Sequence, residues 1–246
     1  MKKRRVPLII AIDGPAGSGK STAARKLAEA EGFALLNSGA MYRAVTHLVI
    51  EGGVDAKRAP ERAAEIAREM EFTYKLSRKG EPRFLVAPRK GAPAADLTDV
   101  LFTAALTQKL KPVVNNESVR AALVEKMRSA ARDVLAQGAS GVVLEGRDIG
   151  TVVFPDAFLK FYLHADLGER TRRRAAELRA KGEEVEEAGL REQIAYRDQI
   201  DETRSVGPLK KADDALDVDT TRRGPEEVLA LLREELRKRR ALPATT

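Results

Sequence analysis

An eight-residue segment near the N-terminus has the composition and spacing of a phosphate-binding loop. Gly14-Pro15-Ala16-Gly17-Ser18-Gly19-Lys20-Ser21 fits the pattern G-x-x-x-x-G-K-[ST] in full. Its glycines let successive N–H groups point inward at phosphate oxygens, and the helix expected after it adds the positive end of its dipole. Lys20 can neutralise β- and γ-phosphates, and the Ser21 hydroxyl can bind Mg²⁺ directly or through water.

The motif predicts a nucleoside triphosphate ligand. A glycine-rich turn that binds nothing is the alternative, and the strand and helix expected on either side of the loop argue against it. The motif does not identify what accepts a phosphoryl group, because motors, GTPases and small-molecule kinases all share it.

Polar and charged side chains also follow the second and third expected strands. Ser38 and Arg43 come just after the second strand, and Arg147 and Asp148 just after the third. Ligands gather at the carboxyl ends of parallel strands, so we expect these residues to face the same cleft as the phosphate loop. Arg43 suits a phosphate, with an ordinary surface arginine as the alternative. Charges at the end of a buried strand need a partner or a ligand. Arg147 and Asp148 could therefore bind a ligand, or they could form an ion pair with a structural role only.

Two charged helical segments lie further along the chain. At 100° per residue, Arg197, Asp201 and Arg204 fall on one helix face. Like charges grouped in this way repel unless an anion neutralises them, so an arginine-bearing flap over a triphosphate is one interpretation. A solvated charged helix is the other, above all for Arg172 and Arg174. The preceding helix contains Arg170, Arg172, Arg173 and Arg174.

Short apolar runs alternate with helical patterns along most of the chain. Strands separated by helices imply parallel pairing with right-handed crossovers, so we expect an α/β fold with a doubly wound, five-stranded parallel sheet. The expected strands are 8–12, 33–36, 141–145, 158–164 and 215–219. The expected helices are 19–30, 40–50, 61–70, 116–137, 166–181 and 189–200, and a last one that begins near Pro225.

The region between about residues 71 and 110 breaks this alternation and predicts an inserted lobe. The long helix that follows has Asn115 or Asn116 as its N-terminal cap and Gly138 as its stop. In the lobe we expect strands at 71–76 and 83–87, with a turn at 78–80 between them. A helical segment is expected at 97–110.

Composition excludes several classes of protein. The chain has 246 residues, of which 43% are hydrophobic and 33% charged, which is typical of a globular protein and not of a disordered one. It has no cysteine, which excludes disulfides and thiolate metal sites, and its two histidines make a zinc enzyme of the usual kind unexpected.

The net charge of +7 does not by itself indicate a nucleic-acid ligand. Removing eight basic residues at the two ends leaves a net charge of −1, so we expect solvated basic tails and no nucleic-acid partner. Aromatic residues, at 4%, also give few platforms for stacking bases. The eight residues are Lys2, Lys3, Arg4, Arg5, Arg237, Lys238, Arg239 and Arg240.

No stretch approaches the ~20 apolar residues needed to cross a bilayer, so no membrane association is expected. The start, MKKRRVPLIIAID, superficially resembles a signal peptide. Its apolar run stops at Asp13 and leads into the glycine-rich loop, which a buried strand explains better. We expect a cytoplasmic protein.

Taken together, these segments resemble the bacterial cytidylate kinase (CMP kinase) family, from about residue 6 to 236. The resemblance is carried by GPAGSGKST, LLNSGAMYR, EGRDIGTVVFPDA and YRDQIDETRSVGPLKKADDALDVDTT, and the last three separate this family from other nucleoside monophosphate kinases. It implies a single P-loop kinase domain with a core at about 6–37, 116–165 and 207–240, an acceptor-binding insert at about 38–115, a lid region at about 166–206, and basic tails at 1–5 and 237–246.

The resemblance also implies roles for individual residues. ATP would be bound by Gly14, Pro15, Ala16, Gly17, Ser18, Gly19, Lys20, Ser21, Thr22, Arg170 and Arg174, with Arg173 also in the lid. CMP would be bound by Ser38, Tyr42, Arg43, Thr107, Arg120, Arg147, Asp148, Arg197, Asp201 and Arg204. Of these, Arg43 would hold the acceptor phosphate, Arg120 and Asp148 would reach the cytosine, and Asp201 would bind the ribose hydroxyls. Lys20, Arg147, Arg197 and Arg204 would be catalytic, and Ser21 would bind Mg²⁺.

The chain departs from the family in three places. Asn37 stands where the family often has Asp, and Ile200 stands where some members have another arginine, which implies that this position is not essential. The stretch KLKPVVNNES is slightly longer than usual, which puts the cytosine-contacting serine of the family near Thr107.

The implied reaction is Mg²⁺-dependent, in-line transfer from ATP to CMP or dCMP, giving ADP and CDP or dCDP, in pyrimidine nucleotide metabolism, by a monomer. A phosphate oxygen of CMP is already anionic near neutral pH, so no general base is needed. The alternatives are a P-loop kinase for another monophosphate or a small metabolite such as shikimate, a GTPase-like switch, which the absence of an N-K-x-D motif disfavours, and a nucleic-acid-dependent ATPase.

Overall fold

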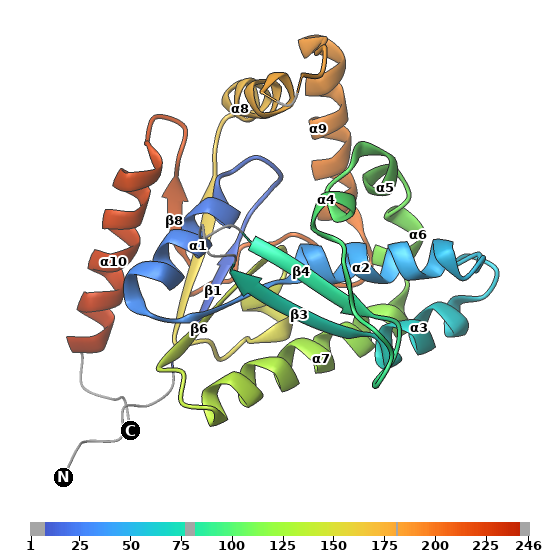
Figure 1. Cartoon of the computed structure of the whole chain (residues 1–246). Helices are drawn as coiled ribbons and strands as arrows, with labels where there is room; N and C mark the ends of the chain where they lie inside the picture. Colours follow the sequence, from blue (N-terminus) through green and yellow to red (C-terminus); the bar gives the residue numbers. More distant parts are fainter. Residues whose placement is uncertain (1–7, 77–81, 181, 242–246) are drawn as a thin grey trace. The chain divides into compact units, whose positions relative to one another are not determined.

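The computed structural model describes residues 8–76, 82–180 and 182–241 of the chain (Figure 1). The chain divides into two compact units. We call Met1–Leu35 together with Val134–Thr246 the phosphate-loop unit, and Leu36–Asp133 the inserted unit. None of the helices in the described ranges combines the length and the apolar composition that a bilayer crossing requires.

The phosphate-loop unit is built on a parallel sheet, as the sequence predicts. Within the described residues the sheet has five strands in the order β2-β6-β1-β7-β8, and β1 lies between β6 and β7. In the parallel register, Ile10 of β1 is opposite Val143 of β6 and Leu159 of β7. The strands are β1 (Leu8–Asp13), β2 (Ala34–Asn37), which begins in this unit, β6 (Gly141–Gly146), β7 (Leu159–His164) and β8 (Leu216–Asp219).

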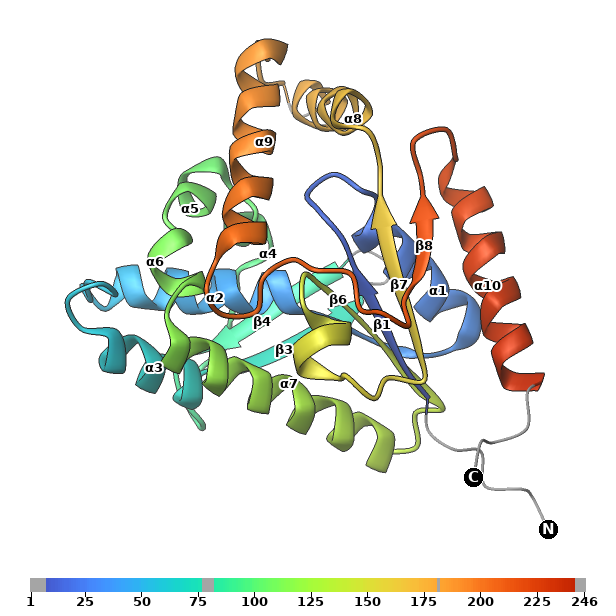
Figure 2. The same ribbon diagram turned by 180° about the vertical axis from the view of Figure 1, so that it is seen from behind.

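Helices α1 (Lys20–Glu31) and α10 (Pro225–Ala241) pack side by side against this sheet (Figures 1 and 2). Apolar side chains of the strands and of both helices form one core, in which Ile10, Leu27 and Leu232 are completely buried. Burying such a side chain contributes about 1.5–3 kcal/mol. This core fixes the carboxyl ends of β1 and β6, from which the candidate site residues project.

Residues 237–241 belong to helix α10 and not to a tail. The expectation of a basic tail from residue 237 is wrong for residues 237–241, because α10 continues to Ala241. The Arg240 guanidinium lies 2.8 Å from the carboxylate of Glu31, and that of Arg239 lies 5.8 Å from the Phe158 ring centroid. These charges therefore belong to the folded surface. The expected tail at 1–5 and residues 242–246 lie outside the described ranges.

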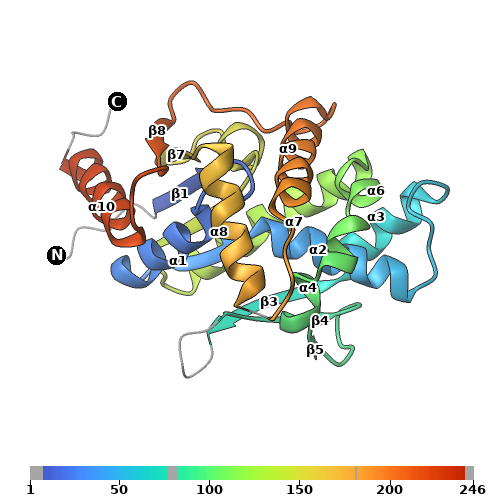
Figure 3. The ribbon, with the colours of Figure 1, turned by 90° about the horizontal axis from the view of Figure 1, so that it is seen from above.

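Helices α8 (Leu167–Arg179) and α9 (Glu187–Thr203) follow β7 and contact each other, and Figures 1 and 3 show that they cross and do not run antiparallel. Ala175 of α8 packs with Leu190 and Ile194 of α9 in a small apolar cluster. The Glu186 side chain begins α9 by accepting a hydrogen bond from Ala188 N at 2.8 Å. Both helices agree with the sequence prediction, and their charged faces remain for other contacts.

In the inserted unit a small antiparallel sheet lies along one side of a group of helices (Figure 3). Its sheet has the order β3-β4-β5 in the described residues. The turn expected at 78–80 lies outside the described ranges. The strands are β3 (Glu71–Leu76), β4 (Pro82–Ala87) and β5 (Ala95–Asp96), and the helices are α2 (Ser38–Glu51), α3 (Pro60–Glu69), α4 (Thr98–Leu101), α5 (Ala104–Gln108), α6 (Lys111–Val114) and α7 (Glu117–Ala136), whose last turn belongs to the other unit.

The prediction of one helical segment over 97–110 is wrong. Helix α4 ends at Leu101, and the Thr103 side chain begins α5 by accepting a hydrogen bond from Leu106 N at 3.3 Å. Threonine competes for backbone hydrogen bonds in this way and so favours helix starts over helix interiors. The chain therefore changes direction at Phe102 and Thr103.

Asn116, not Asn115, is the cap of α7. Its Oδ1 atom accepts a hydrogen bond from Val119 N at 3.0 Å, and its Nδ2 atom donates to Pro60 O at 3.0 Å. One buried amide thus begins α7 and ties it to the start of α3. The sequence analysis assigned α7 to the core, whereas most of this helix lies in the inserted unit.

Candidate nucleotide site

The glycine-rich loop connects the carboxyl end of β1 to the start of α1, as the motif predicts. Gly19 has a φ of +84° immediately before α1, a conformation that favours glycine. At Gly14 a Cβ atom would lie 2.0 Å from Leu163 O, so the loop starts against the backbone of β7 with no room for a side chain. The loop backbone is therefore held close to the sheet by its glycines.

Lys20 and Ser21 begin α1 beneath this loop. Lys20 is 6% exposed, and its Nζ atom donates a hydrogen bond to Pro15 O at 3.0 Å. Burial, together with the nearby Arg147 guanidinium, lowers the pKa of Lys20 to about 7. Ser21 Oγ donates to Glu145 Oε1 at 2.8 Å. An anion bound by the loop would relieve the repulsion that Lys20 experiences from Arg147.

Thr220, just past β8, supports the loop from the far end of the sheet. Its hydroxyl lies 3.0 Å from Ser18 O and 3.1 Å from His164 O, and it accepts a hydrogen bond from Arg173 Nη1 at 3.1 Å. The Arg173 Nη2 atom also donates to Thr220 O at 2.6 Å. Arg173 is thus held by Thr220, the same residue that supports the loop, and it anchors α8 to the end of the sheet.

The charged residues that follow β6 meet the charged face of α9, as the sequence analysis expects. Arg147 Nε donates to Asp201 Oδ2 at 2.8 Å, and Arg204 Nη1 lies 3.4 Å from Asp201 Oδ1. Arg204 Nη2 lies 4.0 Å from Asp148 Oδ1. Burial would raise the pKa of Asp201, but Arg147 holds it below its ordinary value. Two carboxylates and two guanidinium groups therefore form one buried network.

Arg197 lies one helical turn before Asp201 on α9, near the charges of this network. Burial, with Arg147 as the largest charge effect, lowers the pKa of Arg197 to about 10. Arg147 therefore repels both Arg197 and Lys20, which belong to α9 and α1. Cations brought together against their repulsion mark a candidate binding place for a multiply charged anion.

The lid arginines differ in how they are held. Arg170 is buried, donates to Ala16 O in the loop at 3.1 Å and to Ala165 O at 3.0 Å, and pairs with Asp198 of α9. Arg174 is 37% exposed and lies 3.0 Å from Glu177. Arg170 thus joins the loop to both lid helices, whereas Arg174 lies at the surface with Glu177.

In the inserted unit, the expected acceptor residues gather around the start of α2. The Asn37 side chain begins this helix by accepting a hydrogen bond from Ala40 N at 2.8 Å, and Ser38 is buried directly after it. Arg43 donates to Gly39 O at 3.2 Å, and its guanidinium lies 4.9 Å from the centroid of the Phe102 ring. Its charge is supported by a carbonyl and a ring face.

Arg120 of α7 is brought to the same helix. Its guanidinium lies 5.5 Å from the Tyr42 ring centroid, and its Nη1 atom donates to Val114 O at 3.4 Å. Thr107 lies on α5, a helix that packs against α2, and is half-buried. The structure therefore groups Tyr42, Arg43 and Arg120 closely and places Thr107 on the neighbouring helix.

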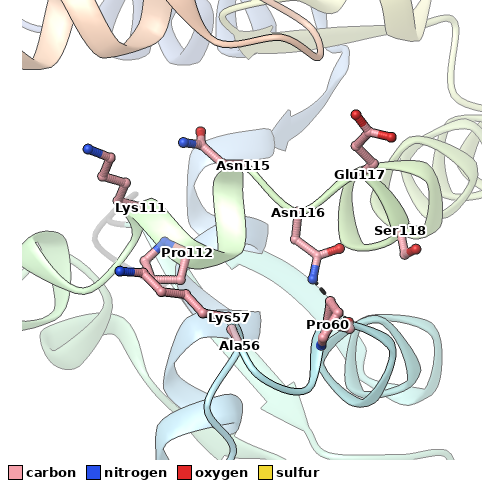
Figure 4. Close-up of a pocket in the computed structure, with 9 residues that line it drawn as sticks. All are labelled: Ala56, Lys57, Pro60, Lys111, Pro112, Asn115, Asn116, Glu117 and Ser118. Carbon is pink, nitrogen blue, oxygen red and sulfur yellow. Dashed lines mark hydrogen bonds between the residues drawn. The ribbon is translucent and has the colours of Figure 1, made fainter.

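A pocket of about 460 Å³ also opens in the inserted unit, between the starts of α3 and α7 (Figure 4). Exposed Lys57 and Lys111 line it, and the hydrogen bond from Asn116 to Pro60 O crosses one side. Among the residues that the structure describes, its lining includes none of the predicted site residues.

Sequence reasoning missed three residues that shape these groups. Glu145 is buried beside Ser21, Asp13 is buried at the end of β1, and Phe102 supports Arg43. An acidic residue at the carboxyl end of a buried strand is a signal that could have identified Glu145 and Asp13. Phe102 has no comparable local signal.

Together, the β2-β6-β1-β7-β8 sheet and the glycine loop with a buried lysine define a P-loop nucleotide-binding protein. The model of the family "Cytidylate kinase" matches residues 10–238. The chain therefore belongs to the cytidylate kinase family.

Individual relatives agree with this assignment. A protein of Caldanaerobacter subterraneus subsp. tengcongensis named "Cytidylate kinase" is 42% identical over 93% of this chain and 94% of its own length. One from Exiguobacterium sibiricum with the same name is 39% identical over 92% of this chain and 95% of its own length. A solved structure of an uncharacterized protein from Eubacterium ventriosum shares the fold, with a TM-score of 0.50 and 14% identity over 95% of this chain and 99% of that one.

Proposed function

We propose that this protein transfers the γ-phosphoryl group of ATP to CMP, giving ADP and CDP, and that dCMP is a second acceptor. The observation that carries the proposal is the family match over residues 10–238, which includes the phosphate loop and the arginine groups of both units. The buried cations support the same reaction, because they suit two phosphate-bearing substrates.

On the donor side, the loop N–H groups and Lys20 would hold the triphosphate of ATP. Lys20 now donates to Pro15 O, and a phosphate oxygen is a stronger acceptor than this carbonyl. Arg170 would hold the loop against the lid, and Arg174, with its exposed partner Glu177, would turn toward the nucleotide. The remaining loop residues, from Gly14 to Thr22, would supply the N–H groups and the helix start.

The residues beside Lys20 fit a magnesium ion. The Ser21 hydroxyl and the Glu145 carboxylate are hard oxygen ligands 2.8 Å apart, a type that Mg²⁺ prefers. No group of three or more His, Cys, Asp or Glu side chains in the described residues could hold a metal ion. We propose that Ser21, with Glu145 as its support, holds an Mg²⁺ that is otherwise bound by nucleotide oxygens and water. When bound, the ion would neutralise charge on the transferring phosphates.

On the acceptor side, Arg43 and Ser38 would bind the CMP phosphate, with Tyr42 packed beside them. Arg120 would donate to the ring acceptors of cytosine, and Asp148 would accept from its exocyclic amine. Uracil lacks this amine and would leave a buried carboxylate unpaired, at a cost of about 1–3 kcal/mol. Thr107 is the candidate for a further cytosine contact, and Asp201 for the ribose hydroxyls.

The chemistry itself needs alignment and charge neutralisation. The attacking phosphate oxygen is anionic near neutral pH, so the site needs no general base. Lys20, Arg147, Arg197 and Arg204 would stabilise the charge that spreads over the transferring group. Closure of the lid helices α8 and α9 would exclude water and so limit hydrolysis of ATP.

A coupled ADP-release assay tests this function directly. CMP, dCMP, UMP, AMP, GMP and shikimate are offered as acceptors with ATP and Mg²⁺, and CDP is identified in the product mixture. We expect the highest kcat/KM with CMP or dCMP. No CDP under any condition, or a clear preference for another acceptor, would refute the proposal.

The proposal extends to the oligomeric state, the location and nucleic-acid binding. We propose that the enzyme acts as a monomer in the cytoplasm, where its nucleotide substrates are found, and without a nucleic-acid ligand. Adding DNA or RNA should leave ADP release unchanged. A rise would favour a nucleic-acid-dependent ATPase instead.

A further inference from the structure

The chain makes an unusual turn directly after Arg147 and Asp148. Residues Ile149–Val153 form a single π-helical turn, η1, at the carboxyl end of β6. Such turns are rare, and they occur often at functional sites. The direction in which Arg147 and Asp148 project therefore depends on how the start of η1 is held.

A carboxylate from another strand holds that start. Asp13 Oδ1 accepts a hydrogen bond from Ile149 N at 2.9 Å, and Asp13 Oδ2 accepts one from Gly150 N at 2.7 Å. Asp13 is 5% exposed and lies opposite Gly146 in the register of β1 and β6. One buried side chain thus binds the two N–H groups that follow Asp148, and it starts one residue away from Arg147 in the sheet.

Gly150 fits this arrangement. A Cβ atom at this position would lie 3.4 Å from Asp13 Oδ2 and 3.1 Å from Lys160 Cδ. The second contact is tighter than ordinary van der Waals packing, so glycine lets the N–H group reach the carboxylate without displacing the Lys160 side chain.

We propose that Asp13 is a positioning residue for the acceptor side of the reaction, whose ionised carboxylate fixes the backbone from which Arg147 and Asp148 project. The proposal rests on the function proposed above. Each oxygen accepts from one of the two N–H groups, and an amide NH₂ or a protonated O–H at either oxygen position replaces an acceptor by a donor, so one of these hydrogen bonds is lost or weakened. Loss of the charge therefore releases one end of the turn.

The cost of this charge supports a functional role. Burial raises the pKa of Asp13 to about 6, although the N–H groups of Gly150 and Ile149 oppose the shift. The facing charges are Asp148, which also raises the pKa, Arg147, which lowers it, and Lys160, whose stem packs on Gly150. Since the pKa in the folded state exceeds that of the unfolded chain, the ionisation of Asp13 lowers stability as pH rises from about 4 to about 6.

The test compares Asp13→Asn with the wild type between pH 5 and pH 8. CMP also titrates near pH 6, but the ratio of the two kcat/KM values for CMP at each pH cancels this substrate effect. We expect the variant to be about tenfold poorer at pH 8 and the ratio to approach one below pH 6. The KM for ATP should change less than the kcat/KM for CMP.

Asp55→Asn is the matched control. Asp55 Oδ1 also accepts hydrogen bonds from two backbone N–H groups, those of Lys57 at 2.9 Å and Arg58 at 3.3 Å, at a turn outside the candidate site. The ratio of the kcat/KM for CMP of Asp55→Asn to that of the wild type should stay near one at every pH. A flat ratio for Asp13→Asn, or an effect confined to the KM for ATP, would overturn the proposal.

A measurement on the wild type covers the case in which the variant does not fold. The backbone amide resonances of Ile149 and Gly150 should shift together with a midpoint near pH 6. Resonances that stay constant from pH 5 to pH 8 would overturn the proposal. Because this titration needs no substrate, its outcome is independent of whether the protein makes CDP.

Discussion

The two units of the molecule hold their arginines by different means. In the phosphate-loop unit, Arg147 and Arg204 are paired with buried carboxylates, most directly with Asp201. In the inserted unit, Arg43 and Arg120 rest on the ring faces of Phe102 and Tyr42 and donate to backbone carbonyls.

The difference has a consequence for substitutions beside these arginines. A carboxylate fixes a guanidinium strongly but neutralises its charge, and a buried pair that loses one partner leaves an uncompensated charge. A ring face contributes about 0.5–2 kcal/mol to holding a guanidinium and carries no charge of its own. Replacing a ring beneath an arginine should therefore cost less than breaking one of the buried ion pairs.

Lys20→Ala should have the largest effect, because it removes the buried ammonium beneath the phosphate loop. We expect kcat to fall by about 10²–10³. Lys26→Ala is the control, since Lys26 on the same helix pairs with exposed Glu226, and it should keep near-normal kcat. A Lys20→Ala enzyme within threefold of the wild type would remove this lysine from the catalytic group.

Arg147→Ala tests the ion-paired network. Because it removes a cation proposed to stabilise the transition state and leaves Asp201 with one guanidinium fewer, we expect turnover to fall by at least about tenfold. Steady-state kinetics with saturating CMP and ATP measure this fall. Near-normal turnover would show that the paired arginines of this unit are structural only.

Asp148→Ala tests how the site distinguishes cytosine from uracil. The preference for CMP over UMP, measured as the ratio of kcat/KM values, should fall by about tenfold to a hundredfold. Asp156→Ala, at an exposed position, is the control and should keep the preference. An unchanged ratio in Asp148→Ala would show that this carboxylate does not read the base.

Phe102→Leu tests the ring-supported arginine and should have a smaller effect. Phe102 is 38% exposed, so the loss of its ring under Arg43 corresponds to about 0.5–1 kcal/mol, or a two- to fivefold rise in the KM for CMP. Phe102→Tyr keeps the ring and should behave like the wild type. Equal KM values for all three proteins would contradict the distinction between the units.

The smallest expected signal is proton uptake on nucleotide binding. The pKa of Lys20 is about 7 in the free protein, and phosphate oxygens would raise it. At pH 8, ATP binding should therefore take up a fraction of a proton, seen by calorimetry in buffers of different ionisation heat, and at pH 6 almost none. The Lys20→Ala protein should lose this uptake. In the free protein the same shift makes stability rise with pH from about 7 to 10.5.

The sequence predicts the parts of this molecule that local pattern decides. The spacing from Gly14 to Ser21 and the apolar runs around it specify the loop and the sheet, because a buried strand and a glycine-rich turn are properties of neighbouring residues. The charged face of α9 follows in the same way from helical periodicity, which places Arg197, Asp201 and Arg204 together.

Contacts between distant residues were not predictable in this way. Asp13 reaches Ile149 across 136 positions, and Ser21 reaches Glu145 across 124. The contact of Phe102 with Arg43 depends on a turn created when the Thr103 side chain begins a new helix, where periodicity indicates one continuous segment. The two-residue strand β5 is too short to show alternation.

Thr220 and α10 complete the fold from the C-terminal part of the chain, which is synthesised last. The Thr220 hydroxyl meets the phosphate loop 202 positions after Ser18, and Leu232 of α10 covers the core that Ile10 and Leu27 begin. At roughly 5–20 residues per second, a ribosome takes about ten seconds or more to deliver these closing elements. Until then the nascent chain carries an uncovered apolar face, which is the surface that a chaperone would protect.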